Sequence, residues 1–180
     1  YVQGDRRLQS RLAAAVLSVP AIRGMEFGLG FAAATLPGSR AHDPLGYDDA
    51  RGYVHASNRS GGIEGGISTG ETIVVRAAMK PISTLREPLD SVEMGSHAPV
   101  KSRFERSDVC AVPAAGIVLE AVIALTLADA ALERFGGATV DDVVAAADAF
   151  KRRIRERCAG GGASAASAGR DTGGISGARP

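Results

Sequence analysis

Apolar side chains near the start of the chain recur at the spacing of one helical face. The positions i, i+4, i+7, i+8 and i+11 of this segment hold Leu8, Leu12, Ala15, Val16 and Val19. Asp5 stands ahead of the pattern as a candidate N-cap, and Pro20 ends it because proline excludes the preceding residue from the helical region. The pattern therefore predicts a first helix that begins near Asp5 and stops before Pro20.

A second apolar stretch predicts a long helix over residues 113–135, ended by Gly136-Gly137. It is apolar on nearly all sides, which is typical of a helix packed between two layers. Its length also suits a membrane span, but Glu120 and Asp129 lie within it. One acid near the centre of a span costs roughly 2.5–3.5 kcal/mol. We therefore expect a buried helix of a soluble protein.

A last helix is predicted after these glycines. Thr139 with Asp142 three residues later resembles a capping box, and the apolar stripe behind it holds Val143, Ala147, Phe150 and Ile154. Residues 151–157 are basic and are expected to be a solvated helix end, where cations favour the negative end of the helix dipole. From residue 159 onward Gly, Ala and Ser dominate. The pattern predicts a folded domain over 1–158 and a disordered tail over 159–180.

Strand patterns are shorter and lie between the first and second helices. Residues 72–79 alternate, so that Arg76 faces away from the apolar set Ile73, Val75, Ala77 and Met79. Other short strands are predicted at residues 24–28, 53–56 and 102–105. Residues 40–50 are polar and rich in turn formers, and are expected to form a loop.

Residues 28–33 match the G-x-G-x-x-A form of the dinucleotide fingerprint, with Asp48 and Asp49 about twenty residues further on. The fingerprint requires a helix after its glycines. Pro37-Gly38 ends the segment within a turn or two. We therefore attribute the match to the glycine-rich composition and not to a nucleotide site.

Two glycine pairs, Gly61-Gly62 and Gly65-Gly66, precede the 72–79 strand. Such pairs suit positive φ or a close approach of the backbone to a ligand. Arg76 beside them is either a solvated charge or an anion ligand. The Lys-Pro-Ile-Ser-Thr segment at 80–84 adds an ammonium and two hydroxyls, which donate to phosphate or carbonyl oxygens.

Arg106-Ser107-Asp108 lies between the last predicted strand and the long apolar helix. Arg106 and Asp108 are two residues apart, so on an extended segment their side chains share one face. By spacing alone they are best interpreted as an ion pair.

Composition limits the classes of function. With 21 basic and 20 acidic residues in 180, the chain has no overall field that attracts nucleic acid or an anionic membrane. Cys110 and Cys158 are far apart, which favours neither a disulfide framework nor a metal site and fits a reducing compartment. The three histidines stand without a partner at motif spacing. The chain opens on Tyr1 without a methionine, so we expect a piece of a longer chain.

Long blocks of the chain resemble one family. The blocks SNRSGGIEGGISTGETIVVRAAMKPISTL, from residue 57, and RSDVCAVPAAGIVLEAVIALTLADAALERFGG, from residue 106, are similar to chorismate synthase, and the second is that family's C-terminal signature region. The resemblance also covers VPAIRG at residues 19–24 and extends to about residue 157. The chain is thus identified as the C-terminal part of a chorismate synthase.

The resemblance implies a lyase of the shikimate pathway of aromatic amino acid biosynthesis. Its reaction converts 5-enolpyruvylshikimate 3-phosphate to chorismate and phosphate by 1,4-elimination, with reduced FMN as cofactor. NADPH is implied only if the enzyme reduces its own flavin. The family's fold is α+β, with a helical layer sandwiched between antiparallel β-sheets. A cytoplasmic homotetramer is implied, with a small-molecule substrate and neither nucleic acid nor membrane as partner.

The resemblance also assigns roles to residues. Those matching flavin contacts are Pro20, Ala21, Gly65, Lys80, Pro81, Ile82, Ser83, Thr84 and Arg106. Arg106 matches in addition a substrate-binding arginine. Asp108 matches a catalytic acid near the flavin N5 edge, where a carboxylate can relay a proton.

The family's N-terminal half carries a Gly-Glu-Ser-His-Gly-type motif and functional histidines that do not occur in these 180 residues. We therefore expect the chain alone to be inactive. Two alternatives stay open. One is a flavin- or phosphate-binding module without chemistry, which the glycine pairs and residues 80–84 would serve. The other is an oligomerising fragment, which the long apolar helix would serve.

Overall fold

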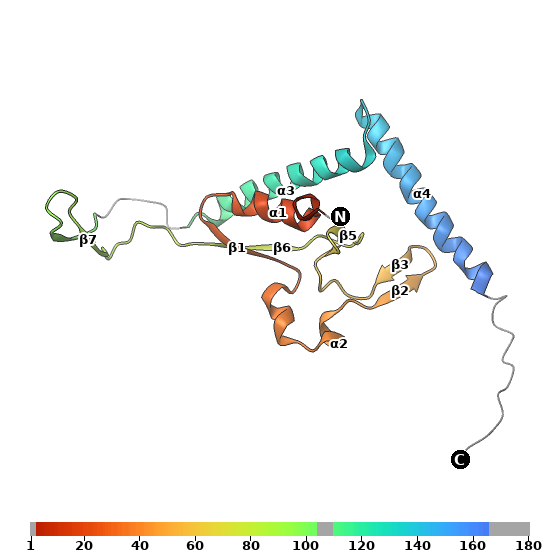
Figure 1. The fold of residues 1–180 in the computed structure, drawn as a ribbon, viewed down its shortest axis with the longest axis horizontal. Helices are drawn as coiled ribbons and strands as arrows, with labels where there is room; N and C mark the ends of the chain where they lie inside the picture. Colours follow the sequence, from red (N-terminus) through yellow and green to blue (C-terminus); the bar gives the residue numbers. More distant parts are fainter. Residues whose placement is uncertain (1–2, 104–109, 166–180) are drawn as a thin grey trace, which may run out of the picture. The chain divides into compact units, whose positions relative to one another are not determined.

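The computed structural model describes residues 3–103 and 110–165 (Figure 1). Within these residues the chain is mixed α+β, and its strands form four two-stranded antiparallel sheets. The chain divides into two compact units. Unit 1 comprises Tyr1–His42 with Asn58–Ala130, and unit 2 comprises Asp43–Ser57 with Ala131–Pro180.

The first predicted helix is confirmed as α1, Leu8–Leu17. It is preceded by the 3-10 helix η1, Gly4–Arg6, which contains Asp5, so the prediction of Asp5 as N-cap is wrong. The N-cap is Arg7, without a side-chain cap. The Leu8 amide instead donates to the Gly66 carbonyl at 2.8 Å, so a neighbouring turn satisfies the first amide of the helix.

The core of unit 1 lies between α1 and the pair β1, Ile22–Phe27, and β6, Val75–Met79 (Figure 1). The buried residues Val16, Val19 and Ile22 form its centre. Partly buried residues from β1, β6 and α3 pack around them, namely Met25, Val75, Met79, Leu119, Val122 and Ile123. The predicted apolar face of the 72–79 segment is therefore confirmed at Val75 and Met79.

The β1–β6 ladder contains a bulge. Ile22 pairs with Met79 and Gly24 pairs with Ala78, so Arg23 is an extra residue in β1. Ile22 and Met25 both reach the core although they are three residues apart. In a regular strand such residues face opposite sides, and the extra residue restores their common face.

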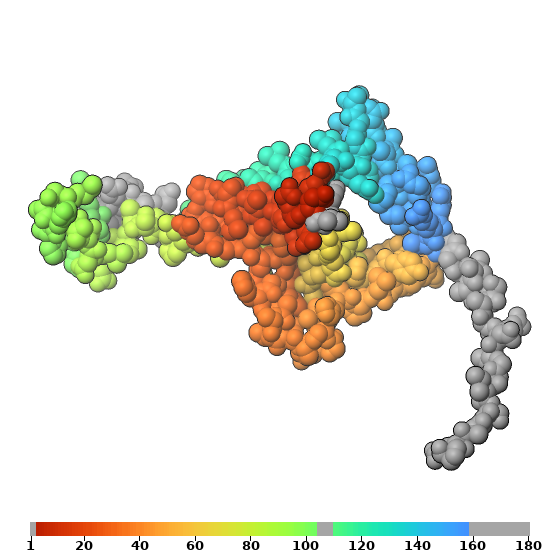
Figure 2. Space-filling view, in the orientation of Figure 1, coloured from red at the N-terminus to blue at the C-terminus, as the bar shows by residue number. Residues whose placement is uncertain are grey.

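Short elements fill the rest of unit 1. The segment after β1 forms the 3-10 helix η2, Gly30–Thr35, and the four-residue helix α2, Gly38–Ala41. Strands β4, Ile63–Glu64, and β5, Ile67–Ser68, form a hairpin whose turn is Gly65-Gly66. In Figure 2 the red surface of the N-terminal helices adjoins the yellow surface of this hairpin, in agreement with the bond from Leu8 to Gly66.

A further hairpin pairs β7, Asp90–Val92, with β8, Pro99–Lys101. A strand was expected slightly later, at 102–105. The Ser102 amide still donates to the Leu89 carbonyl at 2.8 Å, but the strand itself ends at Lys101, and residues 104 and 105 lie outside the described residues. The hairpin is fixed by its own turn, which the alternation pattern does not reveal.

The long apolar helix is confirmed as α3, Val112–Phe135, ended by two glycines at positive φ. Its predicted burial is not seen in this chain. None of its residues is buried, and the side chains of Ile117 and Leu125 are 69% and 71% exposed. α3 is also long enough and apolar enough to cross a membrane, judged by its length and composition alone. Only the side that carries Leu119, Val122 and Ile123 packs on the core.

Unit 2 contains the hairpin of β2, Leu45–Asp48, and β3, Gly52–His55, and the helix α4, Val140–Ala165. The loop predicted at 40–50 is therefore wrong in its second half. The Asp48 carboxylate accepts the Ala50 and Arg51 amides at 3.0 and 2.7 Å, which folds the turn of the hairpin. Tyr47 and Tyr53 then meet edge-to-face across the strands, with ring centroids 5.3 Å apart.

The predicted capping box at the start of α4 is confirmed. The Thr139 amide donates to the Asp142 carboxylate at 2.9 Å, and the Asp142 amide donates back to the Thr139 hydroxyl at 3.3 Å. The Thr139 hydroxyl also donates to the Asp142 carboxylate at 2.9 Å. This bond first, and then the bond from the Thr139 amide, lower the pKa of Asp142. The helix continues past Cys158 to Ala165, beyond the boundary expected from composition.

Candidate functional site

The structure joins two of the predicted site segments at one end of the β1–β6 ladder. The Lys80 amide donates to the Ala21 carbonyl at 2.8 Å, one position beyond the pair Ile22 and Met79. Pro20, Ala21 and Lys80, which are far apart in the sequence, therefore become neighbours. This junction is the first part of the candidate site.

Ala21 has a left-handed backbone with φ +69°. An L-residue with a side chain pays about 1–2 kcal/mol for this conformation. The conformation lets the chain reverse between α1 and β1, which places the Ala21 carbonyl opposite Lys80. Strain of this kind is frequent at sites that hold a ligand.

The segment 80–84 leaves β6 without regular structure. The side chains of Lys80, Pro81 and Ser83 are exposed, and those of Ile82 and Thr84 are partly buried. An ammonium and two hydroxyls on one short extended segment can donate to the oxygens of a phosphate. The segment therefore offers hydrogen-bond donors beside the Ala21 junction.

Gly65 lies elsewhere in unit 1. It occupies the first turn position between β4 and β5, where Gly65 and Gly66 have φ of +59° and +87°, as a type I′ hairpin turn requires. That turn adjoins the N-terminal end of α1, whereas Pro20 follows the C-terminal end. The structure therefore does not place Gly65 beside Ala21 and Lys80. A Cβ added at Gly65 meets no atom within 4 Å, so the residue borders open space.

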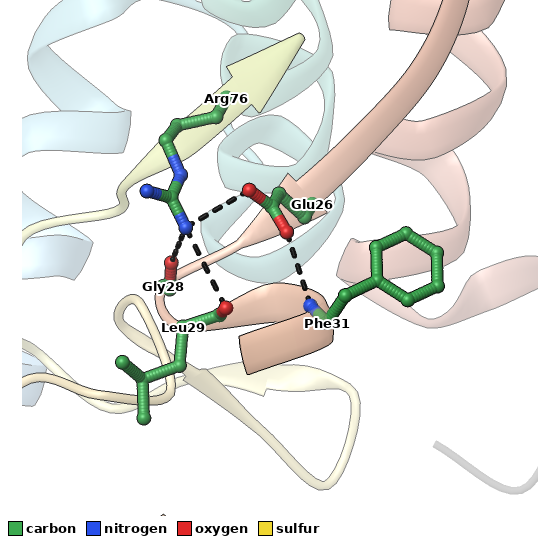
Figure 3. Close-up of polar contacts among 5 residues, drawn as sticks. All are labelled: Glu26, Gly28, Leu29, Phe31 and Arg76. Carbon is green, nitrogen blue, oxygen red and sulfur yellow. Dashed lines mark hydrogen bonds and ion pairs between the residues drawn. The ribbon is translucent and has the colours of Figure 1, made fainter. Parts of the chain in front are cut away.

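The sequence alone allows Arg76 to be a solvated charge or an anion ligand, and the structure gives it a different role. Its Nη2 lies 2.9 Å from Oε1 of Glu26 and donates to the Gly28 carbonyl at 3.0 Å (Figure 3). Oε2 of Glu26 in turn accepts the Phe31 amide at 3.0 Å. Arg76 and Glu26 are also direct partners in the β1–β6 ladder. The pair thus holds the turn after β1, and Arg76 is neutralised.

The backbone is also packed closely at the turn that follows β1. A Cβ added at Gly28, where φ is +53°, would lie 2.0 Å from the Arg59 carbonyl oxygen and 2.4 Å from the Gly61 nitrogen. Only glycine fits such an approach of two backbones. The turn Gly28–Gly30 is followed by a 3-10 helix and not by the longer helix that a dinucleotide fingerprint needs, in agreement with its rejection.

Arg106 and Asp108, the predicted substrate-binding and catalytic residues, lie outside the described residues. An open hollow of about 480 Å³ follows the 80–84 segment and is lined by residues 85–90 with Lys101. Lys101 forms an ion pair with Asp90 there. None of the predicted site residues that the structure describes lines this hollow.

One residue of the junction was missed by sequence reasoning. Arg23 is the bulged residue of β1, and its side chain is exposed two residues after Ala21. The signal was available, because Ile22 and Met25 are two large apolar residues three apart, one just before and one within the strand predicted at 24–28. That spacing fits a strand with one apolar face only if an extra residue intervenes.

The chain matches a known family over most of its length. A family model described as chorismate synthase matches residues 1–132. The chain belongs to the chorismate synthase family. The prediction made from the sequence blocks is therefore confirmed.

The relatives of this family that match the chain are longer. The chorismate synthase of Moorella thermoacetica is 51% identical over 156 residues, which cover 87% of this chain and 41% of the relative. That of Geobacter sulfurreducens is 56% identical over 150 residues, which cover 79% of this chain and 38% of the relative. The chain thus spans about two fifths of the length of these chorismate synthases.

A solved structure gives the same result for the fold. A crystal structure of chorismate synthase matches with a TM-score of 0.71 at 40% identity, covering 86% of this chain and 39% of that one. The α+β class with small antiparallel sheets is therefore that of chorismate synthase.

Proposed function

We propose that the protein to which this chain contributes converts 5-enolpyruvylshikimate 3-phosphate to chorismate and phosphate by 1,4-elimination, using reduced FMN. The observation that carries the proposal is membership of the chorismate synthase family at 51% and 56% identity to two enzymes of that name. The geometry supports it, since the family's Lys-Pro-Ile-Ser-Thr segment lies beside the strained Ala21.

The described residues fit a phosphorylated flavin. Lys80 and Ser83 are exposed beside the Ala21 junction, and Gly65 borders space that a side chain would fill. We propose that Pro20, Ala21, Gly65, Arg106 and the segment 80–84 hold the flavin. When bound, reduced FMN supplies electron density to the substrate while its carbon–oxygen bond breaks.

Two residues outside the described part complete the proposed site. Arg106 carries a permanent charge and a planar fork of donors, and it binds the phosphate or carboxylate of the trianionic substrate. The Asp108 carboxylate accepts a proton on one of its oxygens, because the reaction removes a proton as well as phosphate. NADPH takes part only if the enzyme reduces its own flavin.

We further propose that the whole protein is a cytoplasmic homotetramer that contacts neither nucleic acid nor membrane. In it α3 belongs to a helical layer sandwiched between antiparallel sheets. The exposure of Ile117 and Leu125 supports this arrangement, because an apolar helix gains about 25 cal/mol for each Å² that it buries. The domain proposed at residues 1–158 is then one part of a larger fold, followed by the tail at 159–180.

The same exposed helix favours a second candidate, an oligomerising fragment without chemistry. A hybrid enzyme separates the two. This chain replaces the matching part of the Geobacter sulfurreducens enzyme, and chorismate formation is followed anaerobically with reduced FMN. We expect the hybrid to turn over and the 180-residue chain alone to form no chorismate. A well-folded hybrid without activity would favour the second candidate.

A further inference from the structure

The Asn58 side chain joins the two segments of unit 1 that flank the β4–β5 hairpin. Its Nδ2 donates to the Thr72 carbonyl oxygen at 2.7 Å. A backbone carbonyl only accepts hydrogen bonds, so the amide nitrogen of Asn58 is the group that must face it. The hairpin lies between residues 58 and 72 in the sequence. This bond therefore closes the base of the hairpin.

Backbone contacts continue the closure at the base. The Thr69 amide donates to the Gly62 carbonyl at 3.0 Å. The Val74 amide donates to the Gly61 carbonyl at 3.1 Å. Between these two bonds the Thr72 carbonyl lies against Gly62, because a Cβ added to Gly62 would lie 2.5 Å from its oxygen. The loop that follows β5 is therefore packed against the base so closely that no side chain fits at Gly62.

The hairpin is buried at its base and exposed at its tip. Residues 61–63 are buried, whereas Gly65 is exposed. The tip has a second attachment, because the Gly66 carbonyl accepts the Leu8 amide of α1 at 2.8 Å. A turn that is attached on two sides keeps one direction. The bond from Asn58 closes one of these attachments, so it contributes to the direction in which Gly65 points.

A neighbouring side chain provides a comparison. The Ser57 hydroxyl donates to the Asp43 carboxylate at the base of the other hairpin, β2–β3. This bond ends on Asp43 and not on the glycine hairpin. Ser57 and Asn58 are adjacent in the sequence, and each holds the base of a different hairpin.

We propose that Asn58 is a positioning residue for flavin binding, acting through the Gly65 turn without touching the ligand. This inference rests on the proposed function, in which Gly65 contacts the flavin. Without the bond to Thr72, the loop and the hairpin sample other directions, and the apparent flavin affinity falls with the fraction of molecules in the binding-competent direction. The loss of one neutral hydrogen bond lowers such a fraction by up to about tenfold.

Hydrogen exchange of the 180-residue chain tests the positioning in the absence of ligand. Asn58→Ala should speed the exchange of the Thr69 and Val74 amides by up to about tenfold, because both amides close the base. The β1–β6 amides and the melting temperature should change little. Ser57→Ala is the matched control and should leave Thr69 and Val74 unchanged. Unchanged exchange in Asn58→Ala, or equal acceleration in Ser57→Ala, would overturn the proposal.

Flavin affinity in the hybrid enzyme tests the functional consequence. Titration of flavin fluorescence should give an FMN dissociation constant up to about tenfold higher for Asn58→Ala, with kcat at saturating FMN nearly unchanged. A merely structural role would reduce the amount of folded enzyme and leave the dissociation constant of the folded fraction as it was. Asn58→Asp keeps the size but offers a carbonyl no donor, and it should weaken FMN binding as well. It decides the test if Asn58→Ala fails to fold.

The outcomes separate this inference from the proposed function. A hybrid that binds FMN but forms no chorismate would refute the proposed function, and weaker FMN binding by Asn58→Ala in that hybrid would still support the positioning role. An active hybrid whose FMN affinity is unchanged by Asn58→Ala and Asn58→Asp would refute the positioning role and leave the proposed function standing. A folded hybrid that binds no FMN would refute both.

Discussion

Gly28 and Gly65 show how similar backbone angles arise for different reasons. Gly28 lies against the Arg59 carbonyl, and Gly65 faces open space. Gly28→Ala should therefore lower the free energy of unfolding by roughly 3 kcal/mol, from backbone strain and overpacking together. Gly65→Ala should cost only the strain, about 1 kcal/mol. Urea denaturation of the two variants measures the difference.

The same Gly65→Ala substitution has a second consequence in the hybrid enzyme. If the flavin packs against Gly65, the added methyl group should weaken FMN binding although the fold tolerates it. Titration of flavin fluorescence measures this. Unchanged FMN affinity would remove Gly65 from the proposed binding residues.

Substitutions of Arg106 and of Asp108 are expected to change different kinetic parameters of the hybrid enzyme. Arg106→Ala should raise KM for the trianionic substrate, because a charged hydrogen bond worth roughly 1.5–3 kcal/mol is lost from binding. Asp108→Asn keeps the shape but takes no proton, so kcat should fall by roughly 10²–10⁴-fold. Steady-state kinetics beside thermal melts separate these effects from unfolding. If the two residues form only a structural pair, both variants will melt earlier and keep kcat.

At the scale of single elements, the β7–β8 hairpin depends on its Glu93 carboxylate. Hydrogen bonds from the Ser96 side chain, and then from the Gly95 and Ser96 amides, lower the pKa of Glu93 from 4.5 to about 2. Because the pKa of Glu93 is lower in the folded turn, its carboxylate stabilises the turn fully at pH values above its ordinary pKa of 4.5. This stabilisation is lost as the pH falls through about 2. The Gly95 and Ser96 amide resonances should therefore titrate in NMR spectra with a midpoint near pH 2 and not near 4.5. Glu93→Gln should abolish that titration.

The capping box of α4 gives a second prediction for an element. Thr139→Ala removes the hydroxyl that accepts the Asp142 amide, and loss of an N-cap costs about 1 kcal/mol. The pKa of Asp142, which the Thr139 hydroxyl lowers first, should rise toward its ordinary value. Circular dichroism should show less helix, and acidification should remove less of it than in the unmodified chain, because the lowered pKa is what makes the cap depend on pH. Thr139→Ser retains the hydroxyl and is the matched control.

Elements with strong local signals were predictable, and those fixed by partners were not. The apolar periods of α1 and α3 and the alternation of β6 are properties of single segments, so the sequence predicts them. The β2 strand depends on an aspartate turn at Asp48, which was interpreted as loop. The candidate site shows the same division. Residues 80–84 were recognisable as donors, but their contact with Ala21 depends on a non-local strand pairing.

At the scale of the whole molecule, α3 is a long apolar helix whose side chains stay largely exposed in this chain. Ile117 and Leu125 are more than two thirds exposed, at 69% and 71%. We expect the isolated chain to bind an apolar dye such as ANS strongly, and the hybrid enzyme to bind it weakly because α3 is covered there. Equal dye fluorescence per molecule would contradict the proposed helical layer. Leu125→Gln in the isolated chain should reduce the dye signal.

The bond between Ala21 and Lys80 also bears on how the chain folds. It closes a loop of 59 residues, the difference between positions 80 and 21, whereas β2–β3, β4–β5 and β7–β8 are local hairpins. Loop closure is entropically costly, so the hairpins should form early and the β1–β6 pairing late. The junction is then absent from the folding transition state. A ligand bound at this junction should slow the unfolding of unit 1 and leave its folding rate almost unchanged.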